Sequence, residues 1–178
     1  DARAWGPPNI GGTSSVFQAV NRDKRGVTVD LKDAGQAGQL RGLIVAEADV
    51  VIQNLRPGVI EKSILSSAAL LAEKPRLVYC NLGSFGAVGP LRSKPGYDPL
   101  MQARSGLMSV TGHEGQEPVR IGTSLVDMGA GMWAVIGILA ALNRRSRTGL
   151  GGLVETSLFE TSIAWMAVNA VTGLIGYA

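Results

Sequence analysis

One acidic residue of the sequence lies in a setting that could support covalent chemistry. Asp127 is part of the stretch GTSLVDMGAG, residues 122–131, among small residues and directly before a long apolar run. An aspartate is a favoured helix N-cap. A carboxylate near a helix start, at the edge of an apolar run, could also act as a nucleophile. The residues alone do not separate these two roles.

The same stretch overlaps a loose dinucleotide-binding pattern. Residues 129–134, GAGMWA, fit G-x-G-x-x-A. That motif also requires a preceding strand and an acidic residue about 20 positions later. The next acidic residue is Glu155, beyond a basic segment. Close helix packing therefore explains these glycines better than a nucleotide site.

Two further groups of residues carry possible chemistry. Cys80 and His113 could form a nucleophile–base pair, but Cys80 lies inside an apolar run, where a buried and unreactive thiol is usual. Residues 21–26, NRDKRG, form a basic cluster in which Lys24 and Arg25 could contact phosphate. From spacing alone, a solvated turn explains this cluster better.

Alternating strands and helices must position these residues. Residues 1–15 are rich in glycine, proline and serine and predict a loop. Strands are predicted over residues 27–31, 49–54, 77–83 and 153–159. Helices are predicted over residues 33–47, 59–74, 97–110, 126–143 and from 160 onward, with a break at 143–152. This order predicts an α/β fold with a parallel sheet, whose strand ends carry the polar residues Asn54, Asn81 and Ser84.

Composition narrows the class of function. A formal net charge of +3 and an aromatic content of 5% do not favour nucleic-acid binding. One histidine and one cysteine argue against a structural zinc site. A single cysteine fits a reducing compartment, so we expect a cytoplasmic protein. The apolar runs 128–142 and 163–178 have 15 and 16 residues, fewer than the roughly 20 that span a bilayer, so we expect no membrane span.

Six segments, taken in order, resemble the family III CoA-transferases of the formyl-CoA transferase and carnitine CoA-transferase type (CaiB/BaiF). The segments are VNRDKRGVTVDLK, ADVVIQNLRPGVIEK, KPRLVYCNLGSFGAVGP, PGYDPLMQARSGLMSVTG, GTSLVDMGAGMWAVIGILAAL and RTGLGGLVETSLFE. The resemblance runs over nearly all of the chain. An ordered set of six segments is far more specific than any one of them.

The resemblance implies a Rossmann-like fold that binds coenzyme A, with acyl-CoA and small carboxylic acids as partners and an interlocked homodimer as the assembly. It implies no metal. It places the chain in the large domain, so a strand–helix unit would precede Asp1 and a small domain would follow Ala178. Asp127 matches the family nucleophile, which attacks an acyl-CoA thioester and then carries CoA as an aspartyl thioester. Asp98 matches an acidic active-site position.

The resemblance also implies a set of CoA contacts. The expected contact residues are Asn21, Arg22, Asp23, Lys24, Arg25, Asn54, Leu55, Arg56, Lys62, Lys94, Pro95, Gly96 and Tyr97. Leu55 replaces the usual aromatic residue. Lys62 stands where many relatives have arginine, and it would meet a phosphate as a point charge. Pro95 stands where a relative has lysine, so Lys94 would have to substitute.

Tyr97 distinguishes between two branches of the family. The racemase branch uses a histidine at this position, with the aspartate, as its two bases. A tyrosine ordinarily loses its proton only near pH 10, which makes it a poor base near neutrality. The sequence therefore favours CoA transfer, with Tyr97 as a further active-site residue. The alternatives are a 2-methylacyl-CoA racemase and a non-catalytic CoA-binding module.

Overall fold

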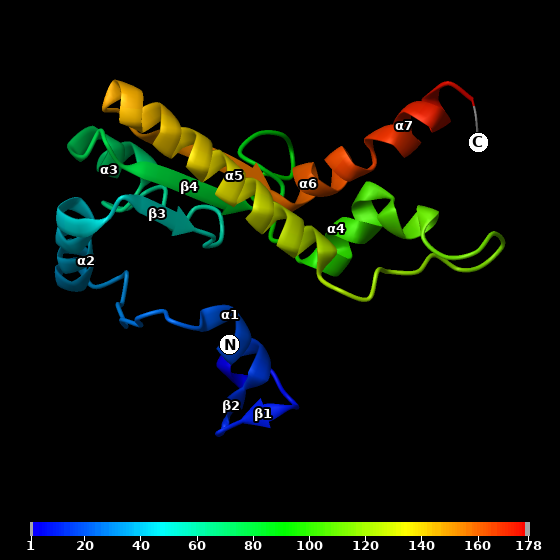
Figure 1. The fold of residues 1–178 in the computed structure, drawn as a ribbon, viewed down its shortest axis with the longest axis horizontal. Coiled ribbons are helices and arrows are strands. Elements are labelled where there is room, and N and C mark those ends of the chain that lie inside the picture. Colours follow the sequence, from blue (N-terminus) through cyan, green and yellow to red (C-terminus); the bar gives the residue numbers. More distant parts are fainter. Residues whose placement is uncertain (1, 177–178) are drawn as a thin grey trace.

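A computed structural model describes residues 2–176. Its centre is a parallel sheet of three strands in the order β3 (Val50–Gln53), β4 (Val78–Gly83) and β5 (Gly152–Ser157) (Figure 1). Asn81 of β4 lies opposite Gln53 of β3 and Glu155 of β5. This register brings the carboxyl ends of the strands to one edge, which is where such sheets bind ligands.

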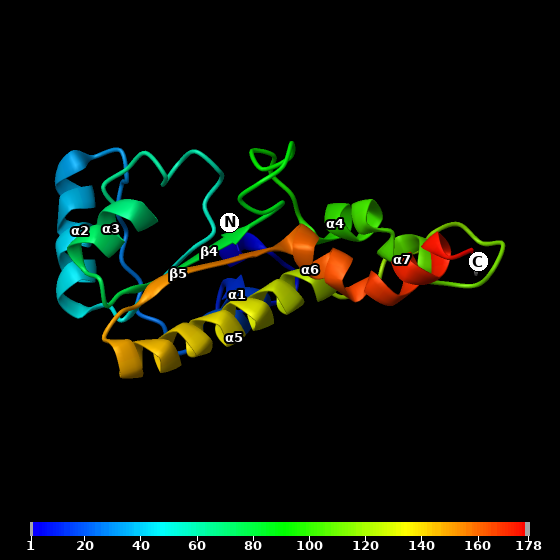
Figure 2. The same cartoon turned by 90° about the horizontal axis from the view of Figure 1, so that it is seen from above.

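Helices cover both faces of the sheet (Figure 2). The side chains of Leu77 and Tyr79 pack in one core cluster with Leu70 of α3 (Ser67–Glu73) and with the neighbouring helix α2 (Ala34–Glu47). Val78 and Cys80, which alternate with them, point to the other face and pack against α5 (Leu125–Thr148). Because successive side chains of a strand point to opposite faces, β4 is buried on both sides, and its near-continuous apolar sequence follows from this.

A second group of helices lies beyond the carboxyl ends of β4 and β5. It consists of α4 (Asp98–Ser105), the 3₁₀ helix η2 (Leu107–Val110) and α6 (Leu158–Trp165). They share a core with the start of α5 that includes Phe85, Met101 and Val126. The helix α7 (Ala167–Leu174) extends away from this group and has no buried residue (Figure 1).

The N-terminal elements lie apart from the sheet in Figure 1. They are the 3₁₀ helix η1 (Ala2–Ala4), the strands β1 (Asn9–Ile10) and β2 (Thr13–Ser14), and α1 (Ser15–Asn21). β1 and β2 pair as a short antiparallel ribbon. An extended and mostly exposed stretch, residues 22–30, joins α1 to the region before α2.

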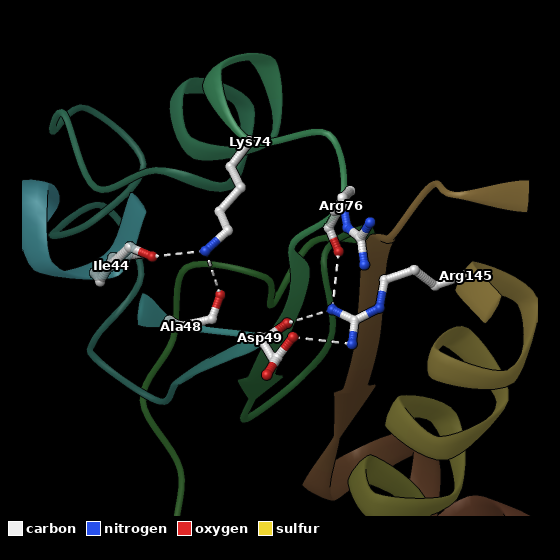
Figure 3. A network of polar contacts seen from close by, with 6 residues as sticks. All are labelled: Ile44, Ala48, Asp49, Lys74, Arg76 and Arg145. Atoms are coloured by element: carbon white, nitrogen blue, oxygen red, sulfur yellow. Dashed lines mark hydrogen bonds and ion pairs between the residues drawn. The ribbon is translucent and has the colours of Figure 1, made fainter. Parts of the chain in front are cut away.

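The far end of α5 is fixed to the amino ends of the strands (Figure 3). Arg145 Nη2 lies 3.0 Å from the carboxylate of Asp49, and Nη1 donates to the carbonyl oxygens of Arg76 at 3.1 Å and Asp49 at 3.3 Å. Nearby, Lys74 Nζ donates to the carbonyls of Ala48 at 2.8 Å and Ile44 at 3.3 Å. We call the residues of these contacts the amino-end clamp. They are Ile44, Ala48, Asp49, Lys74, Arg76 and Arg145.

The length of α5 places its other end far from the clamp. Asp127 is 18 residues before Arg145, which is about 27 Å along a helix. A strand of six residues covers only about 20 Å. Since Arg145 is held at the amino ends of the strands, α5 carries Asp127 past their carboxyl ends.

Much of the predicted architecture is confirmed. The fold is α/β with a parallel sheet flanked by helices, and the strands predicted over 49–54, 77–83 and 153–159 are present with slightly different ends. Asp33 caps α2 as predicted, because its carboxylate accepts from the amides of Gly35 and Gln36 at 2.8 and 3.1 Å.

Two predicted elements near the N-terminus are wrong. Residues 27–31 form no strand, since no described strand pairs with them, and Val27 is exposed. A β-branched run needs a neighbouring strand to complete its hydrogen bonds. The predicted loop over 1–15 instead contains η1 and the β1–β2 ribbon.

Three predicted helices have different bounds. The helix predicted over 59–74 begins only at Ser67, because Ser63 forms local bonds with Ile60 and Leu65 that compete with a helix. The helix predicted over 97–110 is interrupted at Gly106, which has a φ of 87°. The predicted break at 143–152 is wrong for its first half: α5 continues to Thr148, because basic side chains suit the carboxyl end of a helix.

The length of α5 also changes the membrane argument. With 24 residues it is long and apolar enough to cross a bilayer by length and composition, so the argument from a 15-residue run no longer applies. The core helix of a soluble protein passes the same test, and one face of α5 packs on the sheet through Ala134 and Ile138.

Candidate active site

Asp127 lies in the first turn of α5. The helix follows Ser124, whose side chain makes no capping bond. The cap comes instead from Asp98 of α4, whose Oδ2 accepts from the backbone amides of Val126 at 2.7 Å and Asp127 at 3.2 Å. The interpretation of Asp127 as the N-cap is therefore wrong, and its own carboxylate is not used to start the helix.

Asp98 is held in a buried network. Its side chain is 2% exposed, and Gln102, one turn later on α4, is 0% exposed. Gln102 Nε2 donates to Asp98 Oδ1 at 2.6 Å, and Gln102 Oε1 accepts from the backbone amide of Ile121 at 2.8 Å. Both oxygens of Asp98 are thus engaged by protein donors, which is the condition under which a carboxylate can be buried.

The carboxylate of Asp127 differs from that of Asp98 in both respects. It is exposed, and within residues 2–176 it accepts no hydrogen bond. Its pKa is raised from 3.8, first because neighbouring protein atoms displace water and second because the charge of Asp98 lies close. A partly desolvated carboxylate whose oxygens accept no hydrogen bond is suited to attack an electrophilic carbon.

The segment 94–97 lies beside this pair. Gly96 packs so closely on Met101 and Ser84 that any side chain there would collide with the Met101 methyl group. This contact holds the segment against the carboxyl end of β4. Tyr97, 72% exposed, directly precedes Asp98, and Lys94 and Pro95 are exposed. The structure therefore brings this predicted contact segment together with Asp98 and Asp127.

A second predicted contact segment follows β3 at the same edge of the sheet. Gln53 Nε2 donates to Asn81 Oδ1 at 2.8 Å, and its Oε1 accepts from the amide of Leu55 at 2.9 Å. These two bonds fix the chain as it leaves β3. Further along, the structure exposes the side chains of Asn54, Leu55, Arg56 and Lys62.

The structure does not bring the basic cluster 21–25 to Asp127. Asn21 ends α1, and Lys24 Nζ donates to the carbonyl of Val20 at 2.6 Å and to Asn21 Oδ1 at 3.4 Å. Arg22 and Asp23 form an exposed ion pair at 3.7 Å. Arg25 is also exposed. In Figure 1 this segment lies apart from α4 and α5.

Sequence reasoning missed Gln102 and Gln53. Neither belongs to a motif of known chemistry, and each bonds to a distant segment: Gln102 to the backbone amide of Ile121 and Gln53 to the side chain of Asn81. One signal was available for Gln102, since it is four residues after Asp98 and side chains at this spacing meet on a helix.

The chain is similar over most of its length to known CoA-transferases. A family model described as CoA-transferase family III matches residues 1–177. Mouse succinyl-CoA:glutarate CoA-transferase is 35% identical over 99% of this chain and 40% of its own length. The acetyl-CoA:oxalate CoA-transferase of Acetobacter aceti is 38% identical over 93% of this chain and 42% of its own length.

A solved structure gives the same result for the fold. A CaiB/BaiF family protein from Brucella suis superposes with a TM-score of 0.91 at 37% identity, over 100% of this chain and 48% of that one. The chain thus spans about two fifths of the curated relatives named above and about half of this structure. A family match over nearly the whole chain, together with this fold, establishes that the chain belongs to the family III CoA-transferases.

Proposed function

We propose that the protein containing this chain transfers coenzyme A from an acyl-CoA thioester to a carboxylic acid, with Asp127 as the nucleophile. One observation carries the assignment of Asp127. Two carboxylates meet at the start of α5, and among residues 2–176 the oxygens of Asp127 accept no hydrogen bond whereas both oxygens of Asp98 do. The pKa of Asp127 is also raised by desolvation and by the charge of Asp98. Asp98 is buried and bonded on both oxygens, so it acts on the position of Asp127 and not on substrate.

The proposed reaction has two symmetric halves. An oxygen of Asp127 attacks the thioester carbon, the C–S bond breaks, and a mixed anhydride and free CoA thiolate form. The thiolate attacks the aspartyl carbonyl of the anhydride, which releases the donor acid and leaves an aspartyl-CoA thioester. The acceptor carboxylate then displaces the thiolate to form a second anhydride. Attack of the thiolate on the acceptor carbonyl gives the new acyl-CoA and restores Asp127.

Positive side chains at the same edge of the sheet support CoA binding. Arg56, Lys62 and Lys94 are exposed on the two segments that follow β3 and precede α4. Cations at such positions can bind the phosphates of CoA through charge-assisted hydrogen bonds. Lys24 and Arg25 belong to this proposal only if the N-terminal segment approaches the sheet when CoA is bound.

Three general features of the protein remain proposals: its assembly, its relation to the membrane and its location. Large exposed apolar side chains on α5 and α7, among them Met132, Leu139 and Leu174, fit burial in a homodimer. The packing of α5 on the sheet supports a core helix and not a membrane span. The buried free thiol of Cys80 fits a cytoplasmic location.

The test is to trap the aspartyl thioester in the complete gene product. The protein is incubated with a panel of acyl-CoA compounds and treated with hydroxylamine, which converts an aspartyl thioester to a hydroxamate. Peptide mass spectrometry is expected to find the adduct at Asp127. Asp127→Asn should give none, whereas Asp30→Asn, a change of an exposed aspartate outside the site, should label as the wild type does. An adduct at no residue across the panel would count against the proposal.

A further inference from the structure

Gln102 is a polar residue that is fully buried. Neither packing in the core nor direct contact with substrate explains why an amide lies at this position. It lies at the centre of α4, directly after Met101, which is also fully buried. Burying an amide costs free energy unless its donors and acceptors are partnered. Gln102 is partnered on both ends, and both partners belong to the structure around Asp127.

The donor end of Gln102 acts on Asp98. Its Nε2 lies 2.6 Å from Asp98 Oδ1, while Asp98 Oδ2 accepts from the amides of Val126 and Asp127. One oxygen is thus fixed by α4 and the other by α5. Without the amide donor, the Asp98 carboxylate could rotate away from the first turn of α5, and one of its oxygens would be buried without a donor.

The acceptor end of Gln102 acts on the segment that enters α5. The amide of Ile121 donates to Gln102 Oε1 at 2.8 Å, and Ile121 lies six residues before Asp127. The same side chain therefore ties down the approach to the helix and, through Asp98, its first turn.

We propose that Gln102 is a positioning residue for CoA transfer: it orients Asp98 and the entry to α5 so that the Asp127 carboxylate is presented to the thioester. This inference rests on the proposed function. Positioning matters because an error of about 1 Å in a reacting group can cost about 100-fold in rate.

Asp98 is the charged group that Gln102 contacts directly. Asp127 follows on α5, where its backbone amide donates to Asp98. Arg104, also on α4, lies over the Phe85 ring at 5.9 Å from its centroid. On α6, which shares the core with both helices, Glu160 bonds to Ser157 and packs on Gly86. In the entering segment, Arg120 is exposed. A carboxyl group introduced at position 102 would therefore meet Asp98 first.

The test compares two variants of similar shape in the complete gene product. Gln102→Met removes the donor and the acceptor, and we expect kcat to fall about 10- to 100-fold at every pH, with KM for acyl-CoA changed less than about threefold. Gln102→Glu keeps the acceptor for Ile121. Its introduced carboxyl can donate to Asp98 only when protonated, so kcat relative to wild type should rise as the pH is lowered. Gln39→Met and Gln39→Glu, at an exposed site on α2, are the matched controls.

Amide hydrogen exchange gives a readout that does not depend on activity. In Gln102→Met, the amides of Val126 and Asp127 should exchange at least about tenfold faster, because the acceptor Asp98 is no longer held, while the amide of Ala134 should not change. A folded Gln102→Met protein with wild-type kcat and wild-type exchange at both amides would overturn the inference. If exchange changes as expected but wild-type protein transfers no CoA, the proposed function fails, and the hold of Gln102 on Asp98 and the first turn of α5 stands without a role in CoA transfer.

Discussion

The charged side chains at the two ends of α5 differ in their exposure and in their hydrogen bonds. At the amino ends of the strands, the guanidinium of Arg145 is only 17% exposed and binds one carboxylate and two carbonyl oxygens (Figure 3). At the other end of the helix, the carboxylate of Asp127 is exposed and accepts no hydrogen bond within the described residues. A charge with all its hydrogen bonds made holds the structure in place, whereas a charge that accepts no hydrogen bond is available for chemistry.

The contrast repeats at shorter range between two carboxylates. Asp98 has the buried, fully bonded setting of a structural charge, and Asp127 has the free setting of a reactive one. The two settings depend on each other, because Asp98 caps the turn that carries Asp127 and its charge helps to raise the pKa of Asp127.

The largest effect on activity is expected for Asp127, whose carboxylate accepts no hydrogen bond within the described residues. Asp127→Asn keeps the shape of the side chain but removes the nucleophile, and we expect CoA transfer to fall at least about 1,000-fold. The free energy of unfolding at pH 7 should not fall, because the carboxylate makes no hydrogen bond that the variant loses. Steady-state kinetics and urea unfolding measure the two quantities. A variant that transfers CoA at a tenth of the wild-type rate would remove Asp127 from the chemistry.

The next largest effect is expected for Asp98, which caps α5 and lies next to Asp127. Asp98→Ala leaves two helix amides and Gln102 without their acceptor, so we expect a loss of about 2 kcal/mol in stability and about 100-fold in kcat. Asp98→Asn keeps the shape and removes the charge. It should lower the pKa of Asp127, which NMR titration of the Asp127 carboxyl carbon can measure. An unchanged or higher pKa would contradict the role given to the Asp98 charge.

The amino-end clamp should matter for stability alone. Arg145→Met removes three contacts of a mostly buried guanidinium, and we expect a loss of about 1–2 kcal/mol in the free energy of unfolding. The kcat of the folded protein should stay within about twofold of wild type. Arg147→Met, on the same turn but exposed, is the matched control and should cost less than about 0.5 kcal/mol. An Arg145→Met protein with wild-type stability and reduced kcat would contradict a purely structural role for the clamp.

The smallest effect is on the pH dependence of stability. The pKa of Asp127 in the folded protein is raised from 3.8, so between pH 3.8 and the raised pKa the folded state binds more protons than the unfolded chain. The stabilising contribution of this group is fully present below its unfolded pKa and is lost as the pH rises through the folded pKa. The stability of wild type minus that of Asp127→Asn should therefore decrease with rising pH and then level off. A difference that increases with pH would mean that the folded protein favours the charged form.

Periodicity and capping rules predicted the sheet and most of its helices, because these depend on local patterns such as the apolar run of β4 and the Asp33 cap. They failed where a distant group decides the outcome. Residues 27–31 have strand character without a strand to pair with. The carboxyl end of α5 extends through a basic segment, where Arg145 finds Asp49 and Arg76, which are 96 and 69 residues earlier in the chain.

The candidate site shows the same limit. From the residues alone, Asp127 was ambiguous between cap and nucleophile, and its motif in the ordered family resemblance favoured the second role. What the sequence could not show is that Asp98 supplies the cap and that Gln102 accepts from the amide of Ile121, because these bonds join residues 28 and 19 positions apart. The place of residues 21–25 in CoA binding stays a prediction.

The most direct measurement follows the oxygen atoms of the reaction. The complete gene product is allowed to turn over with an acyl-CoA and an acceptor acid whose carboxylate carries oxygen-18, and the protein is then digested and analysed by mass spectrometry. If Asp127 forms the anhydride with the acceptor, cleavage of that anhydride leaves one oxygen of the acceptor in the Asp127 carboxylate and none in Asp98. Turnover that leaves Asp127 without label would contradict the account, because CoA would then have reached the acceptor without a covalent bond to this residue.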